Sequence, residues 1–230
     1  MTSELPRLRV RTRRIADPGE LLRYADPRDP ALVLRRGDGV VGRGCVWRGE
    51  FAGAGRIAEA RAAWRALVEG AAITDDAQVP GSGLIAFGAF AFSAASAAPS
   101  VLRVPRRVVG RRDGIAFVTE IAPLAEIGDA AIDDWGLEAP LPEPEPAGPD
   151  ARTGLADGLM DRAAHRAALE TAIARIEAGE LEKVVVARDA IGRIRPDADR
   201  RSLVRRLATA YPETWTYAVD GLTGASPEML

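Results

Sequence analysis

Two residues in the last 50 positions have side chains suited to moving protons on and off a ligand. Lys183 is the only lysine in the chain, and every other cationic residue apart from one histidine is an arginine. Arginine stays protonated at any ordinary pH, whereas a buried lysine amine can become neutral and act as a base. Glu228 lies in GASPEML, where the apolar residues after it favour a protonated carboxyl. The two side chains are therefore candidates for a general base and a general acid.

Each candidate also has a simpler interpretation. A GC-rich coding bias depletes lysine, and Lys183 would then be a chance survivor whose amine reaches solvent from a strand end. Glu228 would be a strand-edge glutamate that faces water. The small residues Gly224, Ala225 and Ser226 before it leave room for a ligand, so we expect them to bind substrate. Ser226 lacks a GxSxG elbow, which argues against a nucleophile.

The elements around the two candidates are predicted to alternate between helix and strand. A helix is expected from about 157 to 178, with Gly179 ending it. LEKVVVAR follows as a buried strand that turns Lys183, Val185 and Ala187 to one face. ADRRSLVRRLATAY is the next helix. TWTYAVDG and TGASPEML are strands joined by a turn at Asp220-Gly221.

The first part of the chain mixes both element types. LRVRTRRI and ALVLRR read as strands, Ile57 to Glu69 as a helix, and GLIAFGAFAFS as a buried strand. VLRVPRRVVGRRDGIAFVTEI predicts two strands joined through RRDG. EAPLPEPEPAGPD is too rich in proline for helix or internal strand. We therefore expect an N-terminal α/β subdomain at 1–137, a linker at 138–156, and a second unit at 157–230. The predicted fold class is α+β, with antiparallel-rich sheets flanked by helices.

Composition excludes several function classes. The net charge of −2 gives no electrostatic case for nucleic acid or an anionic membrane. The single Cys45 cannot form an internal disulfide, which fits a reducing compartment, and the single His165 excludes zinc motifs built on paired histidines. We find neither a signal peptide nor an apolar run of spanning length. A cytoplasmic location is expected.

The motifs together resemble a known family. A helix ending in AGE, then LEKVVVAR, a helix, and a strand leading into GASPEML are similar to the chorismate-utilising enzymes, in particular the isochorismate synthase branch. The likeness is strong over about 160–230 and weaker over about 80–120, where GLIAFGAFAF is similar to a glycine- and phenylalanine-rich strand of the family. Lysine on the LEKVVVAR strand favours water addition, because relatives that add ammonia typically carry glutamine there.

The resemblance implies a reaction and its participants. Water attacks ring position 2 of chorismate and the hydroxyl at position 4 is lost. The family's base corresponds to Lys183 and its acid to Glu228. Mg²⁺ is implied as cofactor, but the family's magnesium-binding glutamates have no matching position in this chain. The product would feed menaquinone or a catechol siderophore, and salicylate synthase is the second enzyme class.

The chain ends two residues after Glu228, where family members continue for about as long again. We therefore expect this chain alone to be inactive. A shortened gene, a fragment or a split enzyme would each give such a chain. Its expected partners are chorismate and either a missing C-terminal half or a second copy that joins an open sheet edge. The alternative is a truncated, non-catalytic family member, either a decaying remnant or an interaction module.

Overall fold

The computed structural model describes residues 5–127, 135–136, 140–141, 143–151 and 154–228. They form two compact units, Met1–Asp150 with Asp199–Leu230 as unit 1, and Ala151–Ala198 as unit 2. This division differs from the expected one at the proline-rich segment. The last 32 residues do not form a second domain with the preceding helix, because their strands complete the sheet of the N-terminal part.

Unit 1 is built on a large sheet with the strand order β13-β12-β2-β3-β8-β9-β1-β5. All neighbours are antiparallel except β1 and β5. The strands are β1 Leu8–Ile15, β2 Ala31–Arg35, β3 Asp38–Arg43, β5 Ala72–Asp75, β8 Arg107–Arg112, β9 Ile115–Pro123, β12 Trp215–Val219 and β13 Leu222–Ser226. The antiparallel-rich α+β class predicted from the sequence is therefore confirmed.

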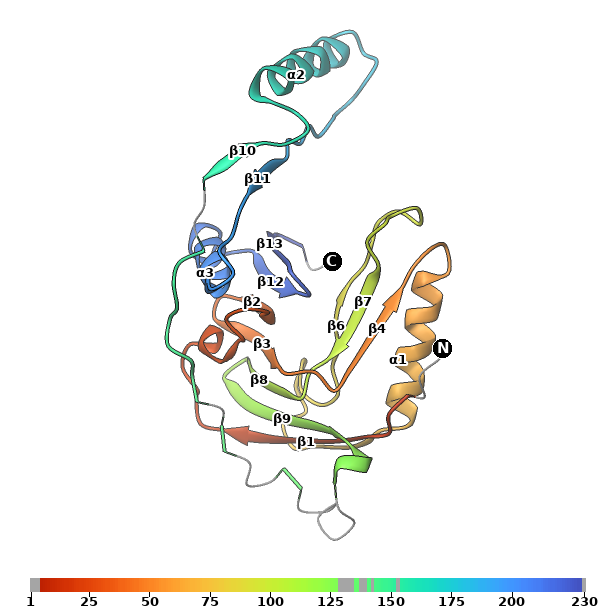
Figure 1. The fold of residues 1–230 in the computed structure, drawn as a ribbon, viewed down its shortest axis with the longest axis vertical. Coiled ribbons are helices and arrows are strands. Elements are labelled where there is room, and N and C mark those ends of the chain that lie inside the picture. Colours follow the sequence, from red (N-terminus) through yellow and green to blue (C-terminus); the bar gives the residue numbers. More distant parts are fainter. Residues whose placement is uncertain (1–4, 128–134, 137–139, 142, 152–153, 229–230) are drawn as a thin grey trace. The chain divides into compact units, whose positions relative to one another are not determined.

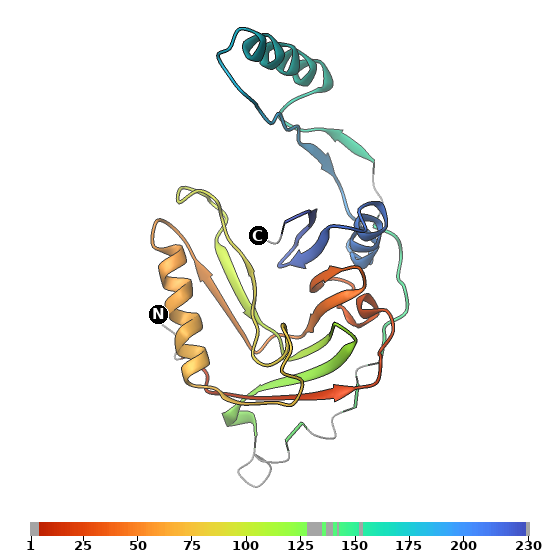
Figure 2. The same cartoon turned by 180° about the vertical axis from the view of Figure 1, so that it is seen from behind.

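A small sheet and the helices complete unit 1 (Figures 1 and 2). The small sheet has the order β4-β7-β6, and helix α1 lies along β4 and β7. Helix α3 packs against β12 and β13. These elements are β4 Trp47–Phe51, β6 Phe87–Ala89, β7 Ser100–Val104, α1 Arg56–Glu69, α3 Arg201–Ala210, and the 3-10 turns η1 Leu21–Tyr24 and η2 Leu124–Glu126.

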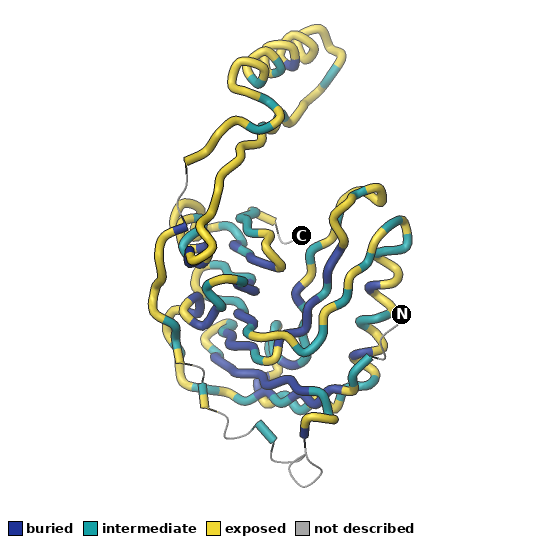
Figure 3. The backbone as a smooth tube through the Cα atoms, viewed as in Figure 1, coloured by how far each residue is buried: buried dark blue, intermediate teal, exposed yellow. Residues whose placement is uncertain are grey.

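The large sheet is buried on both faces. Val109 and Val118 belong to one cluster, which η1 and α3 join through leucines and Val204. Their neighbours Val108 and Phe117 belong to a second cluster, with residues of α1 and β7. Side chains alternate between the faces of a strand, so the middle of β8 and most of β9 are buried on both faces. Burial is concentrated on these strands (Figure 3).

Several local predictions are confirmed and one is corrected. The first strand, the helix before Gly70, the hairpin through Asp113-Gly114 and the turn at Asp220-Gly221 are present as expected. Asp113 and Asp220 each have φ of 50°, followed by glycines at positive φ, which suits two-residue hairpin turns. The expected buried strand GLIAFGAFAFS is only three residues long, however, and Phe92 beyond it is fully exposed.

The proline-rich segment is not a free linker in its described residues. The buried guanidinium of Arg201 donates hydrogen bonds to the carbonyl oxygens of Glu145, at 3.2 Å, and Pro146, at 2.7 Å. It also reaches the carbonyls of Arg23 and Ala25 and pairs with Asp199 at 2.7 Å. Both side chains of that pair are 3% exposed. One arginine thus ties the segment to η1 and to the start of α3.

Unit 2 contains a two-stranded ribbon and one helix. Strand β10 Leu155–Asp157 pairs with β11 Ala190–Gly192, and helix α2 Arg162–Glu177 lies between them in the chain. Asp161 caps α2 by accepting a hydrogen bond from the Ala164 N–H at 2.8 Å. The stretch 181–188, LEKVVVAR, expected as a strand, has no strand partner in the described part of the chain.

Removing Asp199 is expected to destabilise unit 1 strongly. Asp199→Ala leaves a buried arginine cation without its carboxylate, and breaking a buried pair in this way costs about 3 kcal/mol or more of unfolding free energy. Urea denaturation measures the loss. In the double variant Asp199→Ala, Arg201→Met the cost should be smaller, because no unpaired charge remains. The matched control is Glu126→Ala, which breaks the exposed pair with Arg106 and should change little.

The pair also gives a pH dependence. Burial alone would raise the pKa of Asp199, but hydrogen bonds from the Arg201 side chain and from the Gly148 and Arg201 N–H groups hold it below its ordinary value. The stabilisation is therefore complete above the ordinary carboxyl pKa and is lost as pH falls through the lowered one. Equal acid sensitivity in the parent chain and Asp199→Ala would contradict this assignment.

Candidate functional site

Lys183 lies in unit 2, in the extended stretch between α2 and β11. Its side chain is exposed, as are Val185 and Ala187 on the same face. This corrects the expectation of a lysine on a buried strand. An extended segment becomes a strand only when a neighbour takes up its N–H and C=O groups, and the described residues supply none here. In this unit the amine is not desolvated.

The lack of desolvation follows from the composition of unit 2. Its buried described residues are all alanines: Ala151, Ala172 and Ala198. Its large apolar side chains face outward instead, and Figure 3 shows α2 and the ribbon mostly exposed. These exposed side chains, called here the apolar surface of unit 2, are Leu155, Leu159, Leu169, Ile173, Ile176, Val184, Val185, Ile191 and Ile194. Three alanines cannot form a core that would dry an adjacent amine.

Glu228 lies in unit 1, just past the end of β13. The residue is exposed, and its backbone N–H donates to the Ser226 hydroxyl at 3.2 Å. This local bond turns the chain after the strand, in the manner of an ST turn. Ser226 thus has a structural contact of its own. The four predicted residues of GASPE share one hairpin, whereas Lys183 belongs to the other unit.

The space beside Gly224 is already occupied. Gly224 faces Tyr217 across the β12–β13 pair, and a Cβ atom built at position 224 would lie 2.4 Å from the Tyr217 hydroxyl oxygen. The glycine therefore admits the tyrosine ring from the neighbouring strand, where we had expected room for a ligand. The partner could have been found from the sequence, because a two-residue turn at Asp220-Gly221 sets Tyr217 opposite Gly224.

The hairpin that carries GASPE is held at its turn. Both carboxylate oxygens of Asp220 accept hydrogen bonds from the Arg48 guanidinium on β4, at 3.1 and 2.9 Å. These bonds lower the pKa of Asp220 below its ordinary value. Arg48 also pairs with Glu50 on its own strand. The pair links the small sheet to the end of the large one, and β13 is an edge strand among the described strands.

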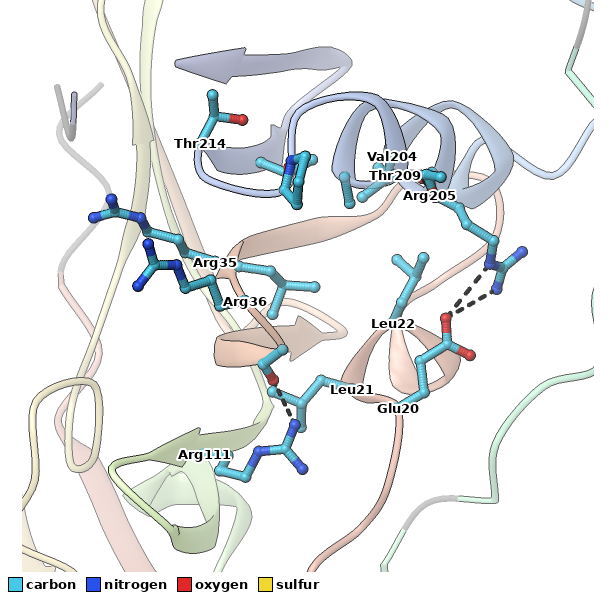
Figure 4. Close-up of a pocket in the computed structure, with 15 residues that line it drawn as sticks. Glu20, Leu21, Leu22, Arg35, Arg36, Arg111, Val204, Arg205, Thr209 and Thr214 are labelled. Carbon is cyan, nitrogen blue, oxygen red and sulfur yellow. Dashed lines mark hydrogen bonds and ion pairs between the residues drawn. The ribbon is translucent and has the colours of Figure 1, made fainter. Parts of the chain in front are cut away.

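A separate cavity of about 270 Å³ lies between α3, η1 and the β2–β3 turn (Figure 4). Its apolar floor includes Leu21, Leu22 and Val204. The arginines around it are engaged with acids or carbonyls. Arg205 pairs with Glu20, and Arg111 donates to the Gly37 carbonyl at 2.7 Å, as the dashed lines show. None of the predicted site residues lines this cavity.

No magnesium site is assembled within the described part of the chain. Those residues bring no three His, Cys, Asp or Glu side chains together in a group that could hold a metal ion. His165 lies half-buried on α2. The described acids therefore do not fit the oxygen-rich shell that Mg²⁺ requires. Among the described helices, none is both long and apolar enough to cross a membrane.

The packing of Tyr217 on Gly224 can be measured as a coupling energy. Gly224→Ala should cost about 1–3 kcal/mol of unfolding free energy, because the new methyl group displaces the ring. In a Tyr217→Ala background the same change should be neutral or stabilising by up to about 1 kcal/mol, since alanine is better than glycine inside a strand. Urea denaturation of the four chains gives the cycle. An equal cost in both backgrounds would show that the ring does not occupy this space.

Comparison with known proteins agrees with the architecture. The family described as "chorismate binding enzyme" matches residues 33–230. MenF, the menaquinone-specific isochorismate synthase from Escherichia coli, has a similar fold, with a TM-score of 0.54 and 20% identity. The match covers 99% of this chain and 53% of the MenF chain, so the chain spans about half the length of that enzyme. No curated protein matches the sequence. The family match extends over most of the chain, from β2 to the GASPE hairpin, and the protein belongs to the chorismate-binding enzyme family.

Proposed function

We propose that the chain is the part of an isochorismate synthase-like isomerase that carries both proton-transfer groups. The observation that carries the proposal is the position of the only lysine. Lys183 follows α2 in LEKVVVAR, within a region that matches the chorismate-binding family. Glu228 follows β13 in GASPE within the same match. Likeness to the fold of MenF supports isochorismate as the product and menaquinone synthesis as its destination.

The proposed reaction balances without any redox partner. The neutral Lys183 amine takes a proton from water as the water oxygen forms a bond to ring carbon 2. The ring double bonds shift, and the bond from carbon 4 to its hydroxyl oxygen breaks. The Glu228 carboxyl gives its proton to that oxygen, which leaves as water. One water enters and one leaves, and the proton on Lys183 returns to Glu228 through solvent before the next turnover.

The base must be an amine that can lose its charge. An arginine side chain holds its proton, and a glutamine amide is too weak a base to deprotonate water. A lysine loses its charge only in surroundings drier than those of unit 2, where residue 183 is exposed. We therefore propose that catalysis needs a further polypeptide over the apolar surface of unit 2, corresponding to the half of MenF that this chain does not cover.

The same polypeptide would supply what the described acids lack. Because those acids form no group suited to a metal, the proposal takes the Mg²⁺ ligands from outside the described part, and no step above passes through the ion. The edge strand β13 has backbone groups facing away from β12, on which such a polypeptide could continue the sheet. Salicylate synthase, which uses the same water-addition step, is the second enzyme candidate.

A non-catalytic interaction module is the second kind of function. The observation that favours it is the exposure of both Lys183 and Glu228, together with the apolar surface of unit 2. A module of this kind needs neither a neutral amine nor a protonated carboxyl. Substitution of Lys183 distinguishes the two proposals. It should abolish turnover if the chain is part of an enzyme, and it should change only the local charge if the chain is an interaction module.

The chain alone is expected to show no sustained turnover. Purified protein is incubated with chorismate and Mg²⁺, and isochorismate and salicylate are measured by chromatography. Lys183 is exposed in unit 2, and the proposed base needs surroundings from which water is excluded. Continuous isochorismate production by the chain alone would contradict the need for a covering polypeptide.

In a preparation that does turn over chorismate, alone or with a co-expressed polypeptide, Lys183→Ala should lower kcat by about 10²–10⁴-fold. Lys183→Arg should be nearly as damaging, because arginine keeps its proton. Glu228→Gln should also lower kcat, since an amide cannot donate the required proton. The matched control is Glu182→Gln, which removes the neighbouring exposed carboxylate and should leave kcat unchanged. A Lys183→Arg enzyme with most of its activity would exclude Lys183 as the base.

A further inference from the structure

Lys183 lies in the segment 158–189, which connects the two paired strands β10 and β11. Strands β10 and β11 pair antiparallel, and Asp157 opposite Ala190 is the last pair of the ribbon. From there residues 158–189 leave the ribbon, form α2, and return through Lys183. Since no strand pairs with residues 181–187 in the part that the structure describes, their path depends on what holds each end.

Asp189 holds the returning end. Its two carboxylate oxygens accept hydrogen bonds from the Leu159 N–H, at 2.9 and 3.0 Å. The Leu159 N–H, with a smaller contribution from the neighbouring Met160 N–H, keeps the pKa of Asp189 below its ordinary value. The donors lie in the loop just before the Asp161 cap of α2. One side chain thus joins the end of the Lys183 stretch to the start of the helix.

Two further contacts fit around this carboxylate. A Cβ atom built at Gly158 would lie 1.9 Å from an Asp189 carboxylate oxygen, so only glycine allows the approach. The neighbouring Arg188 pairs with Asp157 at 2.9 Å, next to the same loop. We call Asp157, Gly158, Arg188 and Asp189 the Asp189 clasp. Arg188 and Asp189, at the end of the Lys183 stretch, therefore contact residues 157–159, just before α2.

The outgoing end of the stretch is held at the C-terminus of α2. Gly179 has φ of 75°, and the Glu180 N–H donates to the Arg175 carbonyl at 3.0 Å. The side chains of Arg175 and Glu180 also pair, at 2.9 Å. Lys183 lies three residues after Glu180 in the chain. Between this anchor and the clasp, residues 181–187 make no hydrogen bond or ion pair within the described part of the chain, although Leu181 and Val186 are half-buried.

We propose that Asp189 is a positioning residue for Lys183, and that the Asp189 clasp sets the path along which the lysine amine is presented. Asp189 does not serve as an acid or base itself, because its oxygens are used by the loop N–H groups. The catalytic part of this proposal rests on the proposed function, since it takes Lys183 as the base. The structural part, that the clasp controls the position and mobility of Lys183, stands without it.

The single lysine makes the proposal directly measurable. Protein labelled with ¹⁵N-lysine gives one lysine amide signal by NMR, that of Lys183. Asp189→Ala should shift this signal and lower its order parameter toward the flexible range, below about 0.6. In uniformly labelled protein, exchange of the Leu159 amide hydrogen should become about tenfold faster or more. Asp189→Asn keeps one acceptor oxygen, so its Lys183 order parameter and Leu159 exchange rate should lie between those of the parent chain and Asp189→Ala.

Gly158→Ala reaches the same clasp from the other side. It leaves Asp189 chemically intact but displaces it, so it should shift the Lys183 signal as Asp189→Ala does. Adding Gly158→Ala to Asp189→Ala should have no further effect, because the clashing carboxylate is gone. The matched control is Glu177→Gln on the exposed surface of α2, which should leave the Lys183 signal in place.

The outcomes separate the clasp from the chemistry. An unchanged Lys183 signal in both Asp189→Asn and Gly158→Ala, with Leu159 exchange accelerated, would overturn the proposal, because the clasp would then open without moving the lysine. In a preparation with turnover, Asp189→Ala should lower kcat by about tenfold with KM little changed, and Asp189→Asn should restore part of it. If Lys183→Ala leaves kcat unchanged while the NMR effects remain, the proposed function fails and the clasp survives.

Discussion

The buried pair of Asp199 and Arg201 is the interaction on which the arrangement of unit 1 depends. It lies where the chain returns from unit 2, and Asp199 bridges to Asp150 where the chain departs. A charge this deeply buried must be fully paired, and Arg201 meets that condition only by gathering carbonyls from η1 and the proline-rich segment. The pair therefore holds together the points where the chain leaves unit 1, at Asp150, and returns to it, at Asp199.

That closure explains why residues far apart in the sequence share one sheet. Strand β12 pairs with β2, so Ala218 lies opposite Leu32, and the GASPE hairpin becomes an extension of the N-terminal strands. The hydrophobic cluster that joins Leu32, Val204 and Ala218 forms only when the return point is fixed. Arg48 then holds the far turn of the hairpin through Asp220. The acid candidate Glu228 therefore follows a hairpin whose turn is held by Arg48 and whose strand β12 pairs with β2.

Sequence reasoning succeeded where the determining forces are local. Alternation in LRVRTRRI, the Asp113-Gly114 turn and the glycine after α1 each depend on a few neighbouring residues, and all three are found as predicted. Proline composition predicted a linker at 138–156, but it could not show that Arg201 binds the carbonyls of Glu145 and Pro146 and ties them to unit 1. The pairing of β12 with β2 was equally hidden, because nothing near either strand encodes its distant partner.

The candidate site follows the same division. The residue types of Lys183 and Glu228 and their places after α2 and β13 could be derived from the sequence, as could the register of Tyr217 on Gly224. The surroundings of Lys183 could not. Three consecutive valines form a strand only if another strand is present to pair with, and the described residues of unit 2 bury alanines alone.

The exposure of Lys183 and the apolar surface around it are two consequences of one physical fact. Val184 and Val185 cost free energy in water, and burying them would remove water from the adjacent amine at the same time. On the proposed function, assembly and activation would then be a single event, because whatever covers the valines would also exclude water from the amine. In unit 2 itself Lys183 is an exposed side chain on a stretch held at its two ends. The hydrogen bonds of Asp189 and the ion pair of Glu180 hold the two ends of that stretch within unit 2, so what the proposed base would still require is the exclusion of water.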